Sequence, residues 1–347
     1  FSGSALAGSY FLGKCKVRNS LLYKSDIRGD ELKRKGDVLH YDDDQELDLV
    51  LKHDEKIDIS NSVLIKTLVH NYSHNPESVE EFFIRNTMSM DYANIHGSPS
   101  DGCFLGPFAT VDLTTMRNSV IGAYSYLQTG GIVSLDVRPG TVWVEKPHQF
   151  NFLYTYPEEE LQHYISLSPD KVPWGVLIDF IEERKEKFQR IFDFVNMENI
   201  SSVPETASLD RYAVVIPKTE IADNVLISQR AYLENSKMGK GADAQENSFI
   251  INSVMEGCDV AAHGAKIIDT TLGRNIFVGF NCFIYGKADA RITIGEDSIV
   301  MPHTIIDCDE PLAVPPHTLV WGLIRNQSEL VNHSVDLDEF ASIQSSF

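Results

Sequence analysis

The sequence predicts a mainly β protein: a parallel β-helix built from six-residue repeats, with two helical insertions. Over residues 203–237 a large aliphatic residue recurs every six positions, at Val203, Leu209, Val215, Ile221, Ile227 and Leu233. Four residues after each of the first five stands a small or β-branched residue. A period of six matches neither a helix face nor simple strand alternation. The chain therefore returns to one side of a core every six residues, as hexapeptide repeats do.

Composition narrows the classes of protein to consider. The chain has 347 residues, 43% of them hydrophobic, enough for a sizeable core in one large domain or two ordinary ones. Fifty acidic residues against 30 Lys and Arg argue against nucleic acid or an anionic membrane surface as a partner. Five widely spaced cysteines without a C-x-x-C pair predict reduced thiols in a cytoplasmic protein. No apolar run is long enough to cross a bilayer. Because the chain opens on Phe1, the sequence leaves open whether residues precede it.

The first third of the chain contains a segment whose fold the sequence does not predict, followed by a segment with six-residue repeats. Residues 1–56 have no clear fold, and the role of their acidic belt, Asp42 to Asp58, stays open because its spacing matches no calcium loop. Coils of the β-helix are predicted over residues 57–138. A short helical insertion at 75–96 interrupts them, opened by Asn as a cap before Pro76.

The remaining two thirds contain the second insertion and the main repeat. Residues 139–200 predict two strands, the second with alternating aromatic residues from Phe150, followed by helix with an apolar stripe. Residues 201–322 form the main β-helix, and 323–347 a C-terminal tail. Within the main repeat, Lys237 to Gly241 predicts a protruding polar loop, after which the six-residue register returns at Val254 and places Lys266 in a core position.

Two segments resemble a known family. Residues 272–282 and 294–300 resemble the consensus of the hexapeptide-repeat superfamily, and residues 314–322 resemble the segment that closes the helix in many of its acetyltransferases. The resemblance implies a left-handed β-helix and usually a homotrimer with sites between subunits. Members include acyltransferases, γ-class carbonic anhydrases and proteins without catalysis.

Histidines are the candidates for chemistry. Acyl transfer needs a base to take a proton from the attacking hydroxyl or amine, and His is best matched to that task at neutral pH. If a ten-residue step counts as one face with a bulging corner, the six-residue count puts His263, Asn281 and His303 in one column on successive coils. In that column His263 or His303 would be the base, and Asn281 would orient the acceptor or polarise a carbonyl.

The first hypothesis is therefore an acyltransferase that uses a thioester such as acetyl-CoA and a small-molecule acceptor that the sequence does not identify. Lys237, Lys240 and Arg274 are the candidates for binding the phosphates of coenzyme A. This hypothesis expects no metal.

Two alternatives stay open. A noncatalytic assembly or binding protein would use the nonrepeat segments as oligomer surfaces. A γ-carbonic-anhydrase-like site would need three zinc-binding histidines. That family places two of them five positions apart, whereas His70 and His74 are four apart. Arg28-Gly29-Asp30 resembles an Arg-Gly-Asp sequence of that family, but it lies before the recognisable repeats. His96 is a further loop candidate for either chemistry.

Overall fold

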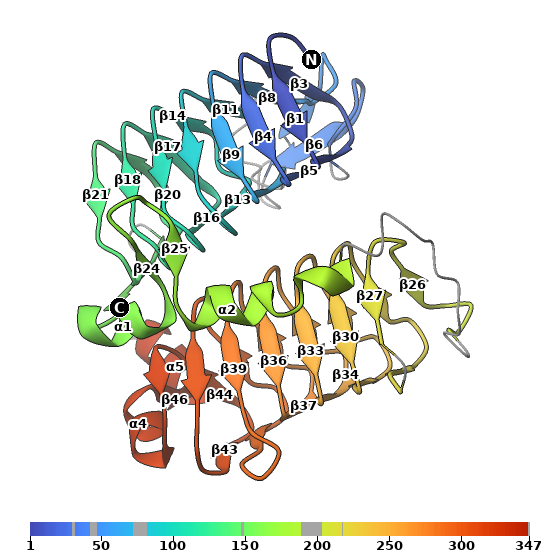
Figure 1. Ribbon diagram of the computed structural model, residues 1–347, viewed down its shortest axis with the longest axis vertical. Coiled ribbons are helices and arrows are strands. Elements are labelled where there is room, and N and C mark those ends of the chain that lie inside the picture. The colour runs from blue at the N-terminus through green and yellow to red at the C-terminus, as the bar shows by residue number, and fades with distance from the viewer. Residues whose placement is uncertain are drawn as a thin grey trace. The chain divides into compact units, whose positions relative to one another are not determined.

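The computed structural model describes residues 1–29, 32–41, 47–71, 82–146, 149–188, 203–216 and 218–345. The chain divides into two compact units, Phe1–Gly175 and Val176–Phe347. Each unit is a left-handed β-helix in which every coil contributes one short strand to each of three parallel sheets (Figure 1). This architecture confirms the predicted fold class.

The first unit contains three sheets, which we name A, B and C in the order in which the chain enters them. Sheet A consists of β1 (Ala5–Ala7), β4 (Leu21–Tyr23), β9 (Val63–Ile65), β12 (Met88–Ser89), β15 (Phe104–Leu105), β18 (Val120–Ile121) and β21 (Asp136–Val137). Sheet B consists of β2 (Tyr10–Leu12), β5 (Asp26–Arg28), β10 (Leu68–His70), β13 (Asn94–His96), β16 (Thr110–Asp112), β19 (Tyr126–Gln128), β22 (Thr141–Lys146) and β23 (Phe150–Thr155). Sheet C consists of β3 (Cys15–Arg18), β8 (Ile57–Ser60), β11 (Phe83–Arg85), β14 (Ser100–Asp101), β17 (Thr114–Arg117) and β20 (Gly130–Val133).

The second unit repeats the plan in sheets D, E and F. Sheet D consists of β26 (Ser208–Leu209), β29 (Leu226–Ile227), β32 (Asp243–Ala244), β35 (Val260–Ala261), β38 (Phe277–Val278), β41 (Ile299–Val300), β44 (Thr318–Val320) and β46 (Ser334–Asp336). Sheet E consists of β27 (Val214–Val215), β30 (Tyr232–Glu234), β33 (Phe249–Ile251), β36 (Lys266–Ile268), β39 (Phe283–Tyr285), β42 (Ile305–Asp307) and β45 (Leu323–Ile324). Sheet F consists of β28 (Glu220–Ile221), β31 (Lys237–Met238), β34 (Val254–Gly257), β37 (Thr270–Arg274), β40 (Ile292–Ile294) and β43 (Leu312–Val314).

The corner between sheets E and F is one residue shorter than a hexad. From Ile250 to Met255, both fully buried, the chain takes five steps instead of six. Asn252 turns the corner in the left-handed backbone region, with φ +50°. The next N–H, that of Ser253, donates to the Ser236 hydroxyl of the preceding coil at 3.2 Å. Serine hydroxyl groups of successive coils therefore accept hydrogen bonds from the buried backbone N–H groups that have no backbone acceptor in this tight turn.

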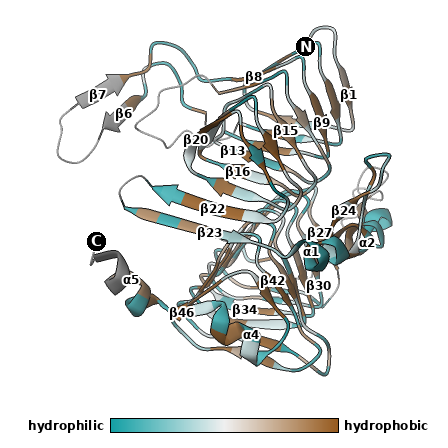
Figure 2. Cartoon of the chain, turned by 90° about the vertical axis from the view of Figure 1, so that its left-hand side faces the viewer, coloured by the Kyte–Doolittle hydropathy of each residue, from teal (hydrophilic) through white to brown (hydrophobic). Residues whose placement is uncertain are grey.

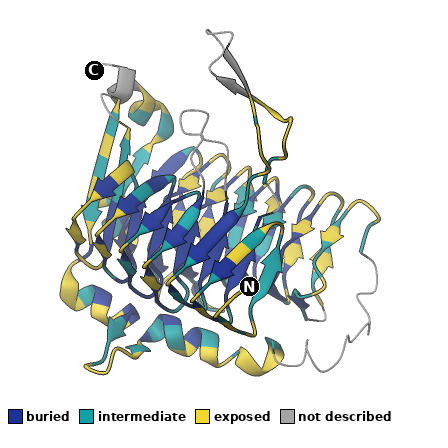
Figure 3. Cartoon of the chain, turned by 90° about the horizontal axis from the view of Figure 1, so that it is seen from above, coloured by how far each residue is buried: buried dark blue, intermediate teal, exposed yellow. Residues whose placement is uncertain are grey.

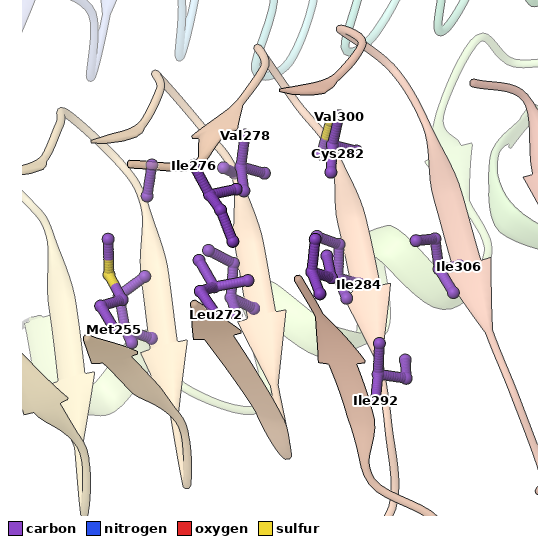
Figure 4. Close-up of a cluster of buried hydrophobic side chains, with 14 of the residues drawn as sticks. Met255, Leu272, Ile276, Val278, Cys282, Ile284, Ile292, Val300 and Ile306 are labelled. Carbon is purple, nitrogen blue, oxygen red and sulfur yellow. The ribbon is translucent and has the colours of Figure 1, made fainter. Parts of the chain in front are cut away.

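Aliphatic side chains fill the interior of each unit. In the second unit, Met255, Leu272, Val278, Ile284 and their neighbours point inward from the three sheets (Figure 4). Buried residues follow the strands of the coils, and exposed residues gather at turns and on the helices (Figure 3). Fully burying one such aliphatic side chain stabilises the fold by about 1.5–3 kcal/mol. The repeating aliphatic positions are therefore the main source of stability.

Within the second predicted insertion the structure describes the two strands, and in the segment predicted to be helical it describes helices α1 and α2 separated by a strand pair. Strands β22 and β23 pair antiparallel and continue past the coils as a two-stranded extension (Figure 2). Helix α1 (Glu158–Tyr164) follows, then the antiparallel pair β24 (Ser166–Leu167) and β25 (Pro173–Trp174), and then α2 (Val176–Glu182). In the second unit, α2 lies along the outer face of sheet E (Figure 1).

The C-terminal segment completes the second unit. Helix α4 (Gln327–Asn332) begins at Asn326, whose side chain accepts a hydrogen bond from the Glu329 backbone N–H. After β46, helix α5 (Leu337–Ser345) follows. Because β45 belongs to sheet E, the β-helix reaches Ile324 and so enters the predicted tail, 323–347.

The structure corrects two predictions about the first unit. Residues 83–96 were predicted to be part of a helical insertion, but they form β11, β12 and β13 of regular coils. The helix start predicted at Asn75 lies outside the described residues. The repeats begin at Ala5 rather than Ile57, with β6 (Val38–Tyr41) and β7 (Leu47–Val50) forming an antiparallel hairpin between coils.

The predicted register is also wrong between Lys237 and Lys266. Residues 237–241 are not a protruding loop, since Lys237 and Met238 form β31 and the Met238 side chain is fully buried in the core. The predicted core positions are right from Leu272 on, but a second five-residue corner, from Ile267 to Leu272, places the preceding core positions at Met255, Ala261 and Ile267, one residue later than predicted. Lys266 consequently lies on the outer face of sheet E rather than in the coil interior.

The five cysteines are free thiols. Among the residues that the structure describes, no helix has both the length and the apolar composition needed to span a membrane.

Candidate functional site

His263 lies at the corner where the chain passes from β35 to β36. The turn is closed by the Ala265 N–H, which donates to the Ala262 carbonyl oxygen at 2.9 Å. Gly264 takes the left-handed position of this turn, with φ +75°, and a Cβ there would stand 2.3 Å from the Asn281 Oδ1. Glycine is therefore required at position 264 both by the backbone conformation and by the close approach of the next coil.

A buried carboxylate holds the His263 ring. Glu246 occupies the equivalent corner one coil earlier, and its carbonyl oxygen accepts the Gly264 N–H at 2.9 Å. Its Oε2 lies 2.7 Å from the His263 Nδ1, and both side chains are buried. At this distance the carboxylate stabilises positive charge on the ring when the imidazole is protonated. The Phe280 ring, from the next coil, lies against the imidazole with centroids 5.3 Å apart.

Asn281 and His303 share this corner on the next two coils. The Asn281 N–H donates to the His263 carbonyl oxygen, and the His303 N–H donates to the Phe280 carbonyl oxygen. Both residues take the left-handed turn position, with φ +51° and +59°, and both are buried. The residue of the preceding coil that aligns with Asn281 and His303 is therefore Gly264. His263 lies one residue before this aligned position. The predicted single column is wrong for His263, because Ala261 and not Val260 aligns with Val278.

The basic candidates lie elsewhere on the coil. Lys237, at the start of β31, and Lys240 are exposed, as is Arg274 at the end of β37. Lys240 and Arg274 occupy the corner between sheets F and D, whereas His263 occupies the corner between sheets D and E. Within one chain the structure does not bring these cations to the histidine.

Lys266 is a buried cation next to the His263 turn. Its Nζ donates to the Gly264 carbonyl oxygen at 2.6 Å. On sheet E it stands between Phe249 and Phe283, whose rings both contact Phe180 of α2. Burial lowers the pKa of Lys266 to about 7, despite the opposing influence of Cys282.

The first unit contains a second histidine–carboxylate pair. His96 ends strand β13 rather than standing in a loop, and its Nδ1 lies 2.7 Å from the Asp112 Oδ1 on the neighbouring strand. The Tyr126 hydroxyl donates to the other oxygen of Asp112 at 2.8 Å. His70 precedes His96 in the same row, while His74 and Asp30 lie outside the described residues.

Sequence reasoning missed Glu246, Asp112 and Tyr126. The signal that would have found the first two is the coil length: Glu246 lies 17 residues before His263, and Asp112 lies 16 residues after His96. A residue one coil away is a spatial neighbour in a β-helix, so the partner of a histidine is sought at that spacing.

Known proteins are similar to this chain in sequence and in structure. Residues 47–169 match the family model described as hexapeptide repeat including loop. A crystal structure from Desulfovibrio desulfuricans G20, of a protein provisionally described as an acetyltransferase, has a TM-score of 0.89 to this chain at 49% identity. That match covers 98% of this chain and 70% of the other. The bifunctional protein GlmU of Rhizobium rhizogenes (strain K84 / ATCC BAA-868) is 26% identical over 136 residues, which are 37% of this chain. The matched part is 28% of GlmU, so the chain spans well under half of that relative.

Proposed function

Because the chain belongs to the hexapeptide-repeat superfamily of left-handed β-helix transferases, we propose that it is an acyltransferase with His263 as general base. The donor is a thioester such as acetyl-CoA, and the acceptor is a small molecule with a hydroxyl or amine. The observation that carries the proposal is the buried Glu246–His263 pair, with 2.7 Å between Oε2 and Nδ1.

The pair suits the proton transfers of this reaction. Nε2 of His263 takes the proton of the acceptor as the acceptor oxygen or nitrogen attacks the thioester carbonyl carbon. The tetrahedral intermediate collapses with cleavage of the carbon–sulfur bond, and the imidazolium returns the proton to the leaving thiolate. Glu246 stabilises the imidazolium during this cycle, as a triad carboxylate does. The products are the acylated acceptor and the free thiol.

Asn281 is the candidate for polarising the thioester carbonyl. Its backbone is bonded to His263, and its side-chain oxygen packs on Gly264, so the side chain is fixed beside the base. Removal of one such polarising donor costs about 10²–10³ in turnover in other enzymes that form a tetrahedral intermediate. His303, fully buried two coils from His263, is the second candidate base.

The proposal is tested by transfer of an acetyl group from acetyl-CoA to a panel of hydroxyl- and amine-bearing acceptors. Product CoA is measured by chromatography, because the exposed Cys258 thiol would consume a thiol reagent. His263→Ala is expected to lower turnover at least hundredfold. Glu246→Gln keeps the shape but not the charge, and it is expected to lower turnover while shifting the acidic limb of the pH profile, which reports protonation of the base.

His317→Ala is the matched control. His317 is a partly exposed histidine of the same unit, at a turn between β43 and β44, and its Nε2 lies 3.2 Å from the Oδ1 of the exposed Asp338. Turnover of this variant should equal that of the native chain. Unchanged turnover in His263→Ala would reject the proposed base, and no binding of acetyl-CoA by calorimetry would favour a noncatalytic binding protein.

A further inference from the structure

Two histidines stand side by side on the outer face of sheet B in the first unit. His70 of β10 and His96 of β13 are register partners, and Asp112 of β16 is the next residue in the row. Val69 and Ile95 occupy the core, so the histidines that follow them face outward. The two rings lie edge to face with centroids 5.1 Å apart, and each offers a ring nitrogen within 4.8 Å of the other.

The surroundings of His96 prepare its ring to bind a metal ion. Asp112 holds Nδ1, so Nε2 presents its lone pair on the other side of the ring. Asp112 is itself fixed by the Tyr126 hydroxyl, whose pKa is raised well above its usual value by burial, so the phenol keeps the proton that it donates. A carboxylate behind a ligating histidine is the common outer-shell arrangement of zinc sites.

A buried amide lies on the same face. Asn94 precedes His96 by two residues and faces the same side of the sheet, and it is 3% exposed. Among the described residues neither its Oδ1 nor its Nδ2 has a hydrogen-bond partner. A buried polar group without a partner costs free energy. A water molecule bound to a metal ion at His96 would satisfy this amide.

We propose that His70 and His96 bind a divalent transition metal ion of the zinc type. Imidazole nitrogen suits this class of metal, whereas magnesium and calcium prefer oxygen ligands. Two nitrogens that each bind one zinc ion at about 2.0–2.1 Å lie roughly 3.4 Å apart, so the two rings turn toward each other when the ion binds. Water or a substrate completes the coordination.

The test is titration of the metal-stripped full chain with Zn²⁺ by calorimetry and with Co²⁺ by visible absorption. The native chain should bind one equivalent, and the Co²⁺ spectrum should show nitrogen ligation. His70→Gln and His96→Gln should each lower the affinity at least hundredfold. Asp112→Asn should weaken binding about 10–100-fold while keeping one equivalent, because it acts through the orientation of His96.

His163→Gln is the matched control, because His163 is an exposed histidine of the same unit, on α1. Its affinity for Zn²⁺ should match that of the native chain. Circular dichroism identifies any variant that fails to fold. If a variant fails to fold, the binding of Zn²⁺ and Co²⁺ by the native chain decides whether the proposal stands. The proposal is overturned if the native chain binds neither ion, or if folded His70→Gln and His96→Gln chains still bind one equivalent with native affinity.

Discussion

At the scale of single residues, the His263 site depends on contacts between coils rather than between sequence neighbours. Glu246 comes from the coil before, and Phe280 and Asn281 from the coil after. Coils in a β-helix stack at the spacing of neighbouring strands, about 4.8 Å. A side chain at a corner therefore meets its counterparts above and below. The chemistry of His263 is consequently sensitive to small shifts of one coil against the next.

Replacing Gly264 with Ala tests this sensitivity. The new Cβ would meet the Asn281 Oδ1 at 2.3 Å, and the left-handed backbone adds about 1–2 kcal/mol of strain. We expect a lower melting temperature and a turnover loss that reflects displacement of Asn281. Gly130→Ala is the control, since Gly130 has φ +74° and no atom lies within 4 Å of the place that its new methyl group would take. Equal effects of the two substitutions would show that Asn281 does not constrain the turn.

Lys266 predicts a pH dependence of stability. Burial lowers its folded-state pKa to about 7 from an unfolded value of 10.5. Between these pH values the unfolded chain binds more protons, so the contribution of Lys266 to stability improves as pH rises from 7 to 10.5. Below pH 7 the folded chain must bury a charged lysine, and the full penalty applies.

Lys266→Met should therefore stabilise the second unit at pH 6, by about 1–4 kcal/mol, and lose this advantage by pH 10. Thermal unfolding followed by circular dichroism at both pH values measures the effect. Lys187→Met, at an exposed position, is the control and should change little at either pH. A Lys266→Met chain that is less stable than the native chain at pH 6 would contradict the argument.

At the scale of elements, α2 protects the outer face of sheet E. Phe180 packs against Phe249 and Phe283 with ring centroids 5.3 and 5.9 Å apart, and Lys266 stands between these two residues. Arg184, one turn on, lies over the Phe180 ring and donates to its carbonyl oxygen. The helix thus covers a stripe that would otherwise expose aromatic rings and a buried lysine.

Phe180→Ala should loosen this cover. Loss of a buried aromatic ring costs about 3–5 kcal/mol, so the melting temperature of the variant should fall. Water would then reach Lys266, and its labelling by acetic anhydride, measured by mass spectrometry, should increase. Val331→Ala, at a position 70% exposed in α4, should leave both measurements unchanged. Native protection of Lys266 in Phe180→Ala would show that α2 is not its cover.

The fold class was predictable from sequence because aliphatic residues mark the interior of the second unit. The repeats of the first unit were harder to predict, because serine residues occupy some of the interior positions that aliphatic residues occupy in the second unit. Ser89 and Ser100 are fully buried in line with Leu64 and Ile84 of neighbouring coils, and their hydroxyls bond to Thr67 and to the Ser98 carbonyl oxygen. A serine that bonds locally leaves no aliphatic period to detect, so those coils were interpreted as a helical insertion.

The candidate site was predictable only in part, because its geometry depends on coil length. A period of six, with the ten-residue step counted as one hexad, found His263, Asn281 and His303 at one corner, but the five-residue corner from Ile267 to Leu272, turned at Asp269, shifts His263 out of the column. Glu246 was missed for the same reason. Corner length is set by turn conformation and by hydroxyl bonds such as that from the Ser253 N–H to Ser236, which the aliphatic pattern does not report.

At the scale of the whole molecule, the proposed donor and base functions lie at different corners of a coil. His263 follows β35 at one end of sheet D, and Lys240 and Arg274 lie at the corner that precedes sheet D. With about 3.3 Å per extended residue, the five residues from Cys258 to His263 span up to roughly 16 Å. The hypothesis needs the cations at the phosphates and His263 at the thioester of one CoA molecule, so the distance between the two corners matters.

We propose a homotrimer in which the basic corner of one subunit lies beside the His263 corner of the next, and this arrangement gives the last prediction. The native chain should have three times the chain mass of 38.9 kDa by light scattering. His263→Ala and the Lys240→Ala/Arg274→Ala double variant should each be inactive alone. Coexpressed, they form mixed trimers in which some interfaces pair an intact histidine with intact cations, so a fraction of native turnover should return. Mass spectrometry shows whether the coexpressed trimers are mixed. If mixed trimers are inactive, the base and the cations belong to the site of one subunit, and a site shared between subunits is contradicted.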